Sequence, residues 1–525
     1  MNYSMGIDVG GTHTDAVLLN SQQEIVAFTK QPITADVMQG IGRAVEVILA
    51  QSSINPAQID RAMLGTTHCT NAIVERKNLE PVAHFRLGAP ATLAVLPLVN
   101  IPANFREKLS VHLFTVSGGY HYDGQLLAAL DEEMIRRQLY SVKGLVSAVS
   151  VCGVFSPVMD TQERLVGEIA QEILGPDIAI SLSSEIGCIG LLERENAAIL
   201  NAALCGVAQS LTNGFKETLL QHNISAPLYF GQNDGTLMPV KQARRLPILT
   251  IASGSTNSIC GAAMLTDLED ALVVDIGGTT TDVGVLKNGF PRQSSLAAEI
   301  GGVRTSFRMP DITSIGLGGG SLVTFDSDGT IHVGPKSVGY QLTQHSLVFG
   351  GDTLTVTDIA VANGWANIGD PGKLAHLCSK QVQRVASHYV AMVERTLERM
   401  NTSLSDMPVI LVGGGACLLP IGLRGASKVI RPAHASVANA TGVAIAKVSG
   451  SVDTIVSTGT ETLEACLLQA EKQARKAAVE AGAIPDTVRI IELESLPLGY
   501  MPGNTVRIRA KAAGTLSTCL SPAQD

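Results

Sequence analysis

Short apolar runs alternate with longer amphipathic stretches along most of this 525-residue chain. The first of them predict two strands joined by a tight glycine turn over residues 5–19, followed by a strand at EIVAFTK. We expect a helix over about 35–51, then strands at RAMLGTT, LVSAVSVCGVF and IAISLSS, with a helix over 161–174 between the last two. A long helix rich in small residues follows over about 191–222. This alternation is typical of an α/β layer with a mixed sheet.

A second, similar block begins near Leu228. It has a strand at PLYFG, glycine-rich turns, a helix over about 374–400 and a strand at MPVILV. We therefore predict an α/β protein with two domains, 1–225 and 226–450, the first carrying a less regular insertion over about 79–145. Residues 451–525 are predicted to form a small α+β segment, a helix followed by two strands.

One acidic, glycine-rich turn occurs near the start of both blocks. MGIDVGGTHTDAVLL begins at Met5, and VVDIGGTTTDVGVL begins at Val273. When the two are aligned, Asp8 corresponds to Asp275, and both copies begin and end in apolar runs. A single turn of this kind is most simply a plain β-hairpin, but two matched copies indicate a shared function.

The chemistry of this turn suits a phosphate group. Glycines allow a close backbone approach and expose N–H donors to an anion, and threonine hydroxyls add further donors. Asp8 and Asp275 end their strands, where carboxylates can hold a hydrated Mg²⁺. Two such hairpins facing across a cleft can bind one polyphosphate, so we predict ATP and Mg²⁺ as cofactors. The predicted phosphate-binding residues are Gly10, Gly11, Thr12, His13, Thr14, Gly277, Gly278, Thr279, Thr280 and Thr281.

Other nucleotide motifs are missing or weaker. The chain has no G-x-x-x-x-G-K-[ST], and GLGGGS lacks the third glycine of the dinucleotide fingerprint. The LVGGGACLLP turn follows an apolar strand and suits a loop that packs against adenine or ribose, which adds Gly413, Gly414 and Gly415 to the candidate nucleotide site.

Composition narrows the class of protein. The net charge of −9 argues against a nucleic-acid surface, and no apolar run reaches the length of a membrane span. Nine cysteines without any CxxC, several of them in apolar stretches, indicate reduced core thiols. With no leader pattern at its start, the chain is expected to be cytoplasmic.

Several stretches together resemble the hydantoinase/5-oxoprolinase family, within the superfamily of actin, sugar kinases and chaperone ATPases. They are GTTHCTNAIVERKN, LLERENAAILNAAL, ASGSTNSICGA, IGLGGGSL and RPAHASVANATGVA. The resemblance implies two actin-like, ribonuclease H-like domains around a nucleotide cleft. It also implies an ATP-dependent hydrolase that phosphorylates the carbonyl oxygen of a cyclic amide, such as a hydantoin, 5-oxoproline or a related lactam.

Two other functions stay open. Some members of this family are ATPase subunits of ketone or acyl carboxylases. A non-catalytic ATP-binding regulator on the same scaffold is the third alternative. After VGPKSVGY the chain reads QLTQHSLVFGGDT, where the family has a Pro- and Gly-rich segment, and this difference favours the alternatives. We expect an oligomer, either of this chain alone or with a second hydantoinase-type subunit.

The substrate-site candidates are less specific. Thr66, Thr67 and His68 form a dense polar cluster after a strand and suit a substrate or phosphate loop. The resemblance suggests Arg194 as a substrate contact and Glu195 as a catalytic acid, although charges at a helix start also suit its dipole. Asp311, just before the IGLGGGS turn, is the remaining candidate for a catalytic acid, together with Asp8 and Asp275. His13 either contacts phosphate or faces solvent.

Overall fold

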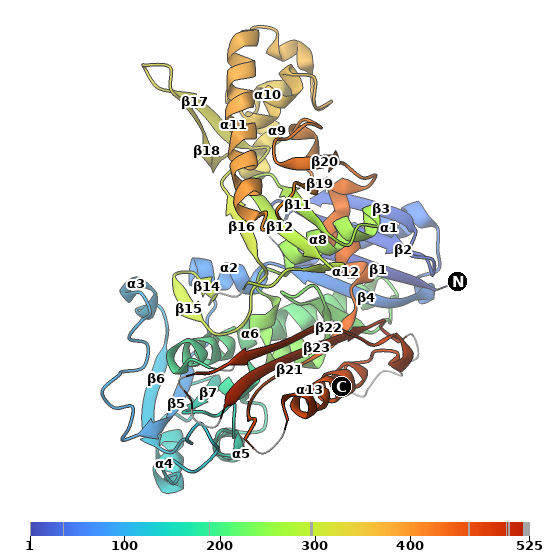
Figure 1. The fold of residues 1–525 in the computed structure, drawn as a ribbon. Helices are drawn as coiled ribbons and strands as arrows, with labels where there is room; N and C mark the ends of the chain where they lie inside the picture. The colour runs from blue at the N-terminus through green and yellow to red at the C-terminus, as the bar shows by residue number, and fades with distance from the viewer. Residues whose placement is uncertain are drawn as a thin grey trace.

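A computed structural model describes residues 2–34, 36–187, 189–294, 298–459, 462–499, 501 and 504–517. It is a mixed α/β protein with several sheets (Figure 1). The largest sheet has the order β22-β23-β21-β10-β9-β4-β1-β2-β3. In chain order its strands are β1 (Tyr3–Val9), β2 (His13–Leu19), β3 (Ile25–Pro32), β4 (Ile59–Thr66), β9 (Leu228–Gly231), β10 (Leu237–Pro239), β21 (Val448–Ser457), β22 (Arg489–Pro497) and β23 (Thr505–Gly514).

A second sheet repeats the pairing at the heart of the first. Its order is β13-β12-β11-β19-β20, with β16 also paired to β12. In both sheets an antiparallel hairpin has its first strand parallel to a later strand and its second strand antiparallel to a third. The strands are β11 (Ala271–Ile276), β12 (Thr281–Lys287), β13 (Phe290–Pro291), β16 (Ile312–Ile315), β19 (Met407–Val412) and β20 (Ala426–Ile430).

The division into domains at residues 225 and 450 stays a prediction. Strands from all three of the predicted segments share the largest sheet, because β9 and β10 follow residue 226 and β22 and β23 follow residue 451. The predicted C-terminal helix and two strands are confirmed as α13 (Leu463–Glu480), β22 and β23.

Two helices, α8 (Ser253–Thr266) and α12 (Ala438–Ile445), lie together between the two large sheets (Figure 1). Their backbones touch, since a Cβ atom on Gly442 would overlap the carbonyl oxygen of Asn257, and one on Gly261 would overlap that of Ala438. Helix α8 contacts strands of both sheets, and α12 packs on β1, β2 and β4. The pair therefore joins the two halves of the molecule.

Residues 79–145 were expected to be a less regular insertion; the insertion stays a prediction, but the segment is more regular than expected. They contribute strands to a parallel sheet of order β6-β5-β7-β8. The strands are β5 (Val82–Ala89), β6 (Val111–Ser117), β7 (Ala148–Gly153) and β8 (Ala179–Leu182), with helices α3 (Ala103–Arg106), α4 (Glu132–Ser141), α5 (Thr161–Leu174) and α6 (Leu191–Gln221). Strand β5 is buried, yet His84 and Arg86 interrupt its apolar pattern, so it did not look like a core strand.

These two polar residues are compensated by Glu195 from α6. Arg86 Nε donates to Glu195 Oε1 at 2.7 Å, and its terminal nitrogen pairs with the other carboxylate oxygen. His84 Nε2 lies 2.8 Å from Glu195 Oε1, and all three side chains are fully buried. Burial favours the neutral acid, but the hydrogen bonds from Arg86 and His84 outweigh it and lower the pKa of Glu195 from 4.5 to about 2.

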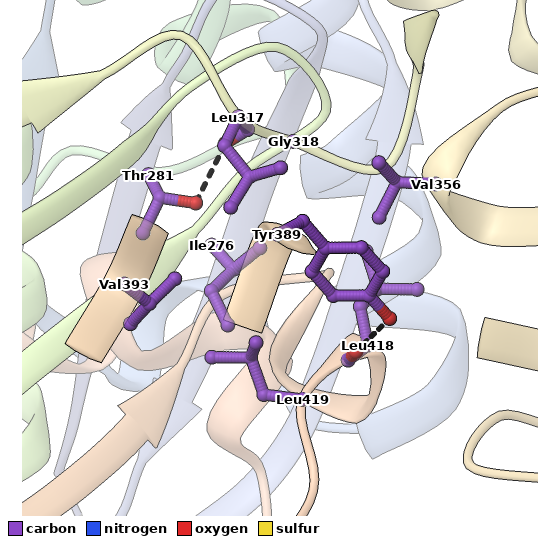
Figure 2. A pocket seen from close by; sticks show the side chains of 9 residues that line it. All are labelled: Ile276, Thr281, Leu317, Gly318, Val356, Tyr389, Val393, Leu418 and Leu419. Atoms are coloured by element: carbon purple, nitrogen blue, oxygen red, sulfur yellow. Dashed lines mark hydrogen bonds between the residues drawn. The ribbon is translucent and has the colours of Figure 1, made fainter. Parts of the chain in front are cut away.

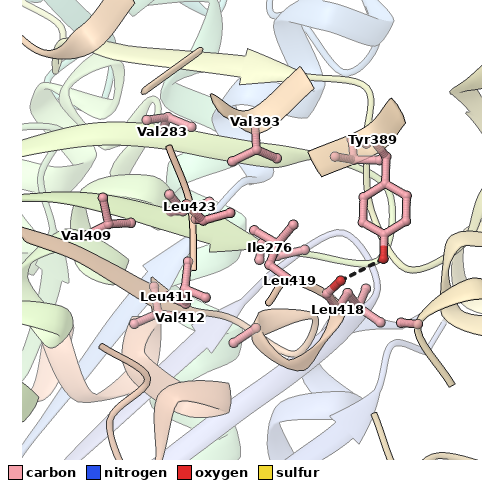
Figure 3. Packing of buried hydrophobic residues seen from close by; sticks show 14 of the residues in the cluster. Ile276, Val283, Tyr389, Val393, Val409, Leu411, Val412, Leu418, Leu419 and Leu423 are labelled. Carbon is pink, nitrogen blue, oxygen red and sulfur yellow. Dashed lines mark hydrogen bonds between the residues drawn. The ribbon is translucent and has the colours of Figure 1, made fainter. Parts of the chain in front are cut away.

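The remaining elements complete the layers. The helices are α1 (Val37–Ser52), α2 (His68–Glu75), α7 (Val240–Arg245), α9 (Leu342–His345), α10 (Val356–Ala362) and α11 (Ser379–Met400), and the short strands are β14 (Ala298–Ile300), β15 (Val303–Thr305), β17 (Ser321–Phe325) and β18 (Ile331–Ser337). Helix α11 packs Tyr389 and Val393 against Ile276 and the aliphatic residues of β19 (Figure 3). The phenol of Tyr389 donates to the carbonyl of Leu418 at 2.8 Å.

Glu195→Gln should destabilise the protein strongly at neutral pH. It keeps the shape but leaves the buried Arg86 without a charged partner, which costs about 3–5 kcal/mol in similar sites. Because the folded-state pKa of Glu195 is depressed, its stabilisation is present above pH 4.5 and is lost as the pH falls toward 2. In urea unfolding, the difference in the free energy of unfolding between wild type and Glu195→Gln should therefore become smaller as the pH falls from 4.5 toward 2.

Glu217→Gln, on an exposed position of the same helix, is the matched control. It should lie within about 0.5 kcal/mol of wild type. If Glu195→Gln behaved like this control at pH 7, the account of the buried cluster would be wrong.

Candidate functional site

The two glycine turns have the same geometry. In the first hairpin Asp8 is paired with Asp15, and the N–H of Gly10 donates to the carbonyl of His13 at 3.0 Å. In the second, Asp275 is paired with Asp282, and the N–H of Gly277 donates to the carbonyl of Thr280 at 2.9 Å. The sequence alignment of the two copies is thus confirmed position by position.

The turns also face each other. A Cβ atom on Gly278 would lie 3.2 Å from Cγ2 of Thr12, although these residues belong to different sheets. Around Gly11 no other atom would come within 4 Å of such a Cβ, so that part of the first turn is open. Two glycine-rich loops therefore meet at one place.

One helix holds the aspartates of both hairpins. From α8, Asn257 Nδ2 donates to Asp8 Oδ1 at 3.2 Å, and Ser258 Oγ donates to Asp275 Oδ2 at 2.5 Å. From α12, Asn439 Nδ2 donates to Asp8 Oδ2 at 2.9 Å. Sequence reasoning missed these three residues, although they lie in the ASGSTNSICGA and RPAHASVANATGVA stretches that carried the resemblance.

The electrostatics of the pair favour a cation. Burial, and then the nearby charges of Asp15 and Asp275, raise the pKa of Asp8 to about 6. Burial, and then the charge of Asp282, raise the pKa of Asp275 to about 6 against the hydrogen bond from Ser258. Asp8 is buried and Asp275 is half-buried, and two carboxylates close enough to repel each other are a donor set that suits a hard divalent ion.

Mg²⁺ needs few ligands from the protein. Among the described residues, no group of three or more His, Cys, Asp and Glu side chains could hold a metal by itself. A magnesium ion usually keeps several waters and takes one or two carboxylates together with substrate phosphates. Asp8 and Asp275 fit that role.

Two further turns pack against the second hairpin. The N–H groups of Gly319 and Gly320 donate to the carbonyls of Gly277 and Gly278 at 3.0 and 2.7 Å. The N–H of Gly415 donates to the carbonyl of Ile276 at 2.7 Å, which places the Gly413–Gly415 turn beside Asp275.

The hydroxyl groups that follow the turns are buried. Thr281 Oγ1 donates to the carbonyl of Leu317 at 2.6 Å, so it supports the neighbouring turn. Thr14 Oγ1, its counterpart, is buried with no hydrogen-bond partner among the described residues. Thr279 and Thr280 are the more accessible hydroxyls of the second turn.

The Thr66–His68 cluster lies beside the first hairpin, where β4 runs parallel to β1. Thr67 Oγ1 donates to the carbonyl of Val9 at 3.3 Å, and Thr66 Oγ1 lies 2.8 Å from Nδ1 of His68. Burial lowers the pKa of His68, which favours the neutral ring. Burial and the charge of Lys30 likewise lower the pKa of His13, whose Nδ1 lies 3.0 Å from Thr12 Oγ1.

Three predicted residues are not brought to the turns. Glu195 is enclosed in the cluster with Arg86, and Arg194 is buried with bonds to Ser183 Oγ at 2.9 Å and to the carbonyl of Gly153. Asp311 pairs with Arg292 at 2.7 Å, and the β12–β16 register places it at the end of β12 away from the turn. Each of the three has a structural partner, and its predicted role at the substrate stays a prediction.

A small apolar cavity of about 10 Å³ lies behind the second turn (Figure 2). Ile276, Thr281, Leu317 and Gly318 line it on the side of the turn, and Tyr389 and Val393 line it from α11. It has room for about one water-sized group, so it is too small for a nucleotide or a cyclic amide.

Comparison with known proteins shows the family to which the chain belongs. Residues 4–174 match the model of the hydantoinase/oxoprolinase N-terminal region, and residues 194–370 match the hydantoinase/oxoprolinase model. The chain belongs to the hydantoinase/oxoprolinase family. The resemblance inferred from the motifs is therefore confirmed.

Two curated relatives of this chain have names that indicate different activities. The chain is 25% identical over 393 residues to the caprolactamase subunit alpha of Pseudomonas jessenii, covering 69% of this chain and 54% of that protein. It is 26% identical over 406 residues to the acetophenone carboxylase gamma subunit of Aromatoleum aromaticum, covering 69% and 53%. The chain thus spans about half the length of these relatives.

Solved structures of the family share the fold. The ATP-dependent caprolactamase from Pseudomonas jessenii has a TM-score of 0.76 and 19% identity, covering 99% of this chain and 89% of that one. A nucleotide-free acetone carboxylase has a TM-score of 0.67 and 19% identity, covering 100% and 89%. The chain therefore has the same overall fold as these two structures. Over the described ranges, no helix combines the length and apolar character needed to cross a membrane.

Gly65→Ala should disturb the site without a change of charge. A Cβ atom at this position on β4 would overlap both Asp8 Oδ1 and Asn257 Nδ2, so the hydrogen bond between them must break or shift. We expect a loss of about 1–3 kcal/mol in the free energy of unfolding, as for other overpacked sites, measured by chemical denaturation. Gly422→Ala, where no atom lies within 4 Å of the added group, is the control. Equal stability of the two variants would contradict the packing of Asp8 described above.

Proposed function

We propose that this protein binds ATP with Mg²⁺ between its two hairpins and uses it to open a cyclic amide. The observation that carries the proposal is the direct approach of the two turns, Gly278 to Thr12, with the buried Asp8 behind the first and the half-buried Asp275 behind the second. Loops that each expose several N–H groups are suited to bind the same phosphate chain from two sides.

Each part of the site has a task in this proposal. The backbone N–H groups of Gly11 and Gly278 bind phosphate oxygens, those of Gly10 and Gly277 close the two turns, and the Gly413–Gly415 turn packs against the nucleoside. Asp8 and Asp275 hold Mg²⁺, which when bound neutralises phosphate charge. Asn257, Ser258 and Asn439 fix the two carboxylates, so the site is organised before the nucleotide arrives.

An amide carbonyl reacts slowly with water, and phosphorylation of its oxygen makes its carbon more electrophilic. Transfer of the γ-phosphoryl group to the carbonyl oxygen releases ADP and traps the imidate form, whose carbon is open to water. Attack by water and loss of the ring nitrogen give an acyl phosphate, and a second water at the same carbon releases phosphate. The protein supplies alignment and charge compensation rather than a covalent nucleophile. We propose that the Thr66–His68 loop, beside the first hairpin, contacts the substrate.

The second candidate is the ATPase subunit of a ketone carboxylase. The similarity to the acetophenone carboxylase gamma subunit favours it as much as the similarity to caprolactamase favours the first. Both relatives are subunits, and this chain spans about half of each, so we propose a second subunit as partner in either case. ADP release with a panel of lactams, hydantoins and ketones, the ketones with bicarbonate, separates the two candidates.

Asp8→Asn and Asp275→Asn should each lower ATP turnover more than tenfold, or about 1.4 kcal/mol in the barrier. The amide keeps the size of the side chain but removes the charge that holds the cation. ADP release at saturating Mg²⁺ measures the effect, and Asp406→Asn at an exposed position is the control. Near-wild-type turnover in both variants would exclude the metal assignment.

An isotope experiment tests the transfer itself. When a cyclic amide labelled with ¹⁸O at its carbonyl is opened in unlabelled water, the label should appear in the released phosphate. The expected result follows because the phosphorylated oxygen leaves with phosphorus. Mass spectrometry of the phosphate gives the answer. A label that stays wholly in the opened product would show that ATP does not activate that oxygen.

A further inference from the structure

Lys30 occupies a central position that the proposed mechanism does not use. It lies on β3 opposite Asp15, and its Nζ donates to both carboxylate oxygens of Asp15, at 2.8 and 2.7 Å. The same ammonium lies 3.4 Å from the carbonyl oxygen of Ser436, far along the chain. Lys30 therefore contacts both halves of the molecule at once.

The contact with the second half extends to the Gly413–Gly415 turn. A Cβ atom on Gly414 would lie 3.3 Å from Cε of Lys30, so the turn packs directly on the lysine side chain. The N–H of Gly413 donates to the carbonyl of Ala435 at 2.8 Å, which joins this turn to the segment that Lys30 binds. Phe28, also on β3, meets His434 edge to face with ring centroids 4.9 Å apart. Strand β3 thus rests on residues 434–436 at two points.

The second hairpin has no matching cation. Asp282 corresponds to Asp15, but its partners are the hydroxyls of Ser255 and Ser314 at 2.5 and 2.6 Å. Ser314 stands on β16 opposite Asp282, in the place that Lys30 has on β3 opposite Asp15. Among the described residues, Asp15 alone of the four hairpin aspartates forms an ion pair. The two otherwise equivalent turns therefore differ by one positive charge.

We propose that Lys30 is a nucleotide-positioning residue that fastens the first phosphate turn to the Gly413–Gly415 turn and its supporting segment. This inference rests on the proposed ATP site and adds a residue to it. A nucleotide that contacts both the first turn and the Gly413–Gly415 turn needs them at a fixed separation. Lys30 sets that separation through Asp15 on one side and Ser436 and Gly414 on the other. It acts through these neighbours and not on the reacting atoms.

The experiment compares Lys30→Met and Lys30→Arg with the full-length wild type. A non-hydrolysable ATP analogue with Mg²⁺ is titrated by calorimetry, and KM and kcat for ATP are measured by ADP release. Lys30→Met should weaken analogue binding and raise KM at least tenfold, with kcat within threefold of wild type. In Lys30→Arg, the dissociation constant of the analogue and the KM for ATP should both lie within threefold of the wild-type values. The reason is that a guanidinium can still bridge Asp15 and a carbonyl. Lys287→Met, at an exposed position on β12, is the control.

The outcomes separate this inference from the proposed function. Absence of analogue binding by the wild type would contradict both. Binding by the wild type and equal binding by a folded Lys30→Met protein, checked by thermal unfolding, would overturn the positioning role alone. The double variant Asp15→Asn/Lys30→Met should still bind the analogue weakly, because the contacts of Lys30 to Ser436 and Gly414 are still missing. Recovery of wild-type affinity in the double variant would show that Lys30 only masks Asp15, and would also overturn the proposal.

Discussion

The site depends on holding two mutually repelling carboxylates, the buried Asp8 and the half-buried Asp275, close together. Asp8 and Asp275 end strands of different sheets, and neighbouring residues of α8 hold one each. Helix α8 itself contacts strands of both sheets, and its backbone packs directly on α12 at Gly261 and Gly442. A larger side chain at either glycine would separate the helices and, with them, the two hairpins. The distance between the two hairpins therefore depends on the packing of these two helices.

The sequence was most informative where local chemistry decides the structure. The two hairpins and the helices α5 and α6 follow from glycine turns and apolar periodicity, and the structure confirms them. Helices α8 and α12 were missed because they are short and rich in Gly, Ser, Thr and Asn, which have low helix propensity. Their stability comes from tertiary contacts, which a single sequence does not display.

In the candidate site, too, some residues can be recognised from the sequence and others depend on tertiary contacts. The two matching turns can be identified from the sequence, because the same motif occurs twice, while their role in phosphate binding stays a prediction. Arg194 and Glu195 show the opposite case, since charged residues at a helix start are equally compatible with a cleft and with a buried network. Only the buried strand β5, with Arg86 facing Glu195, distinguishes the two. Lys30 gave no signal either, because its importance depends on the register between β2 and β3.

The path of the chain through the largest sheet has a consequence for how the protein is made. The chain leaves this sheet after β10, builds the whole second sheet from β11 to β20, and returns only at β21. The second sheet is thus encoded by one continuous stretch and can assemble during synthesis, whereas β10 must wait for β21 to emerge from the ribosome. Until then the unpaired edge of β10 can pair with other chains, so a chaperone or the rest of the growing chain must cover it. The second sheet can therefore be complete before the largest sheet is, because the largest sheet needs strands from both ends of the chain.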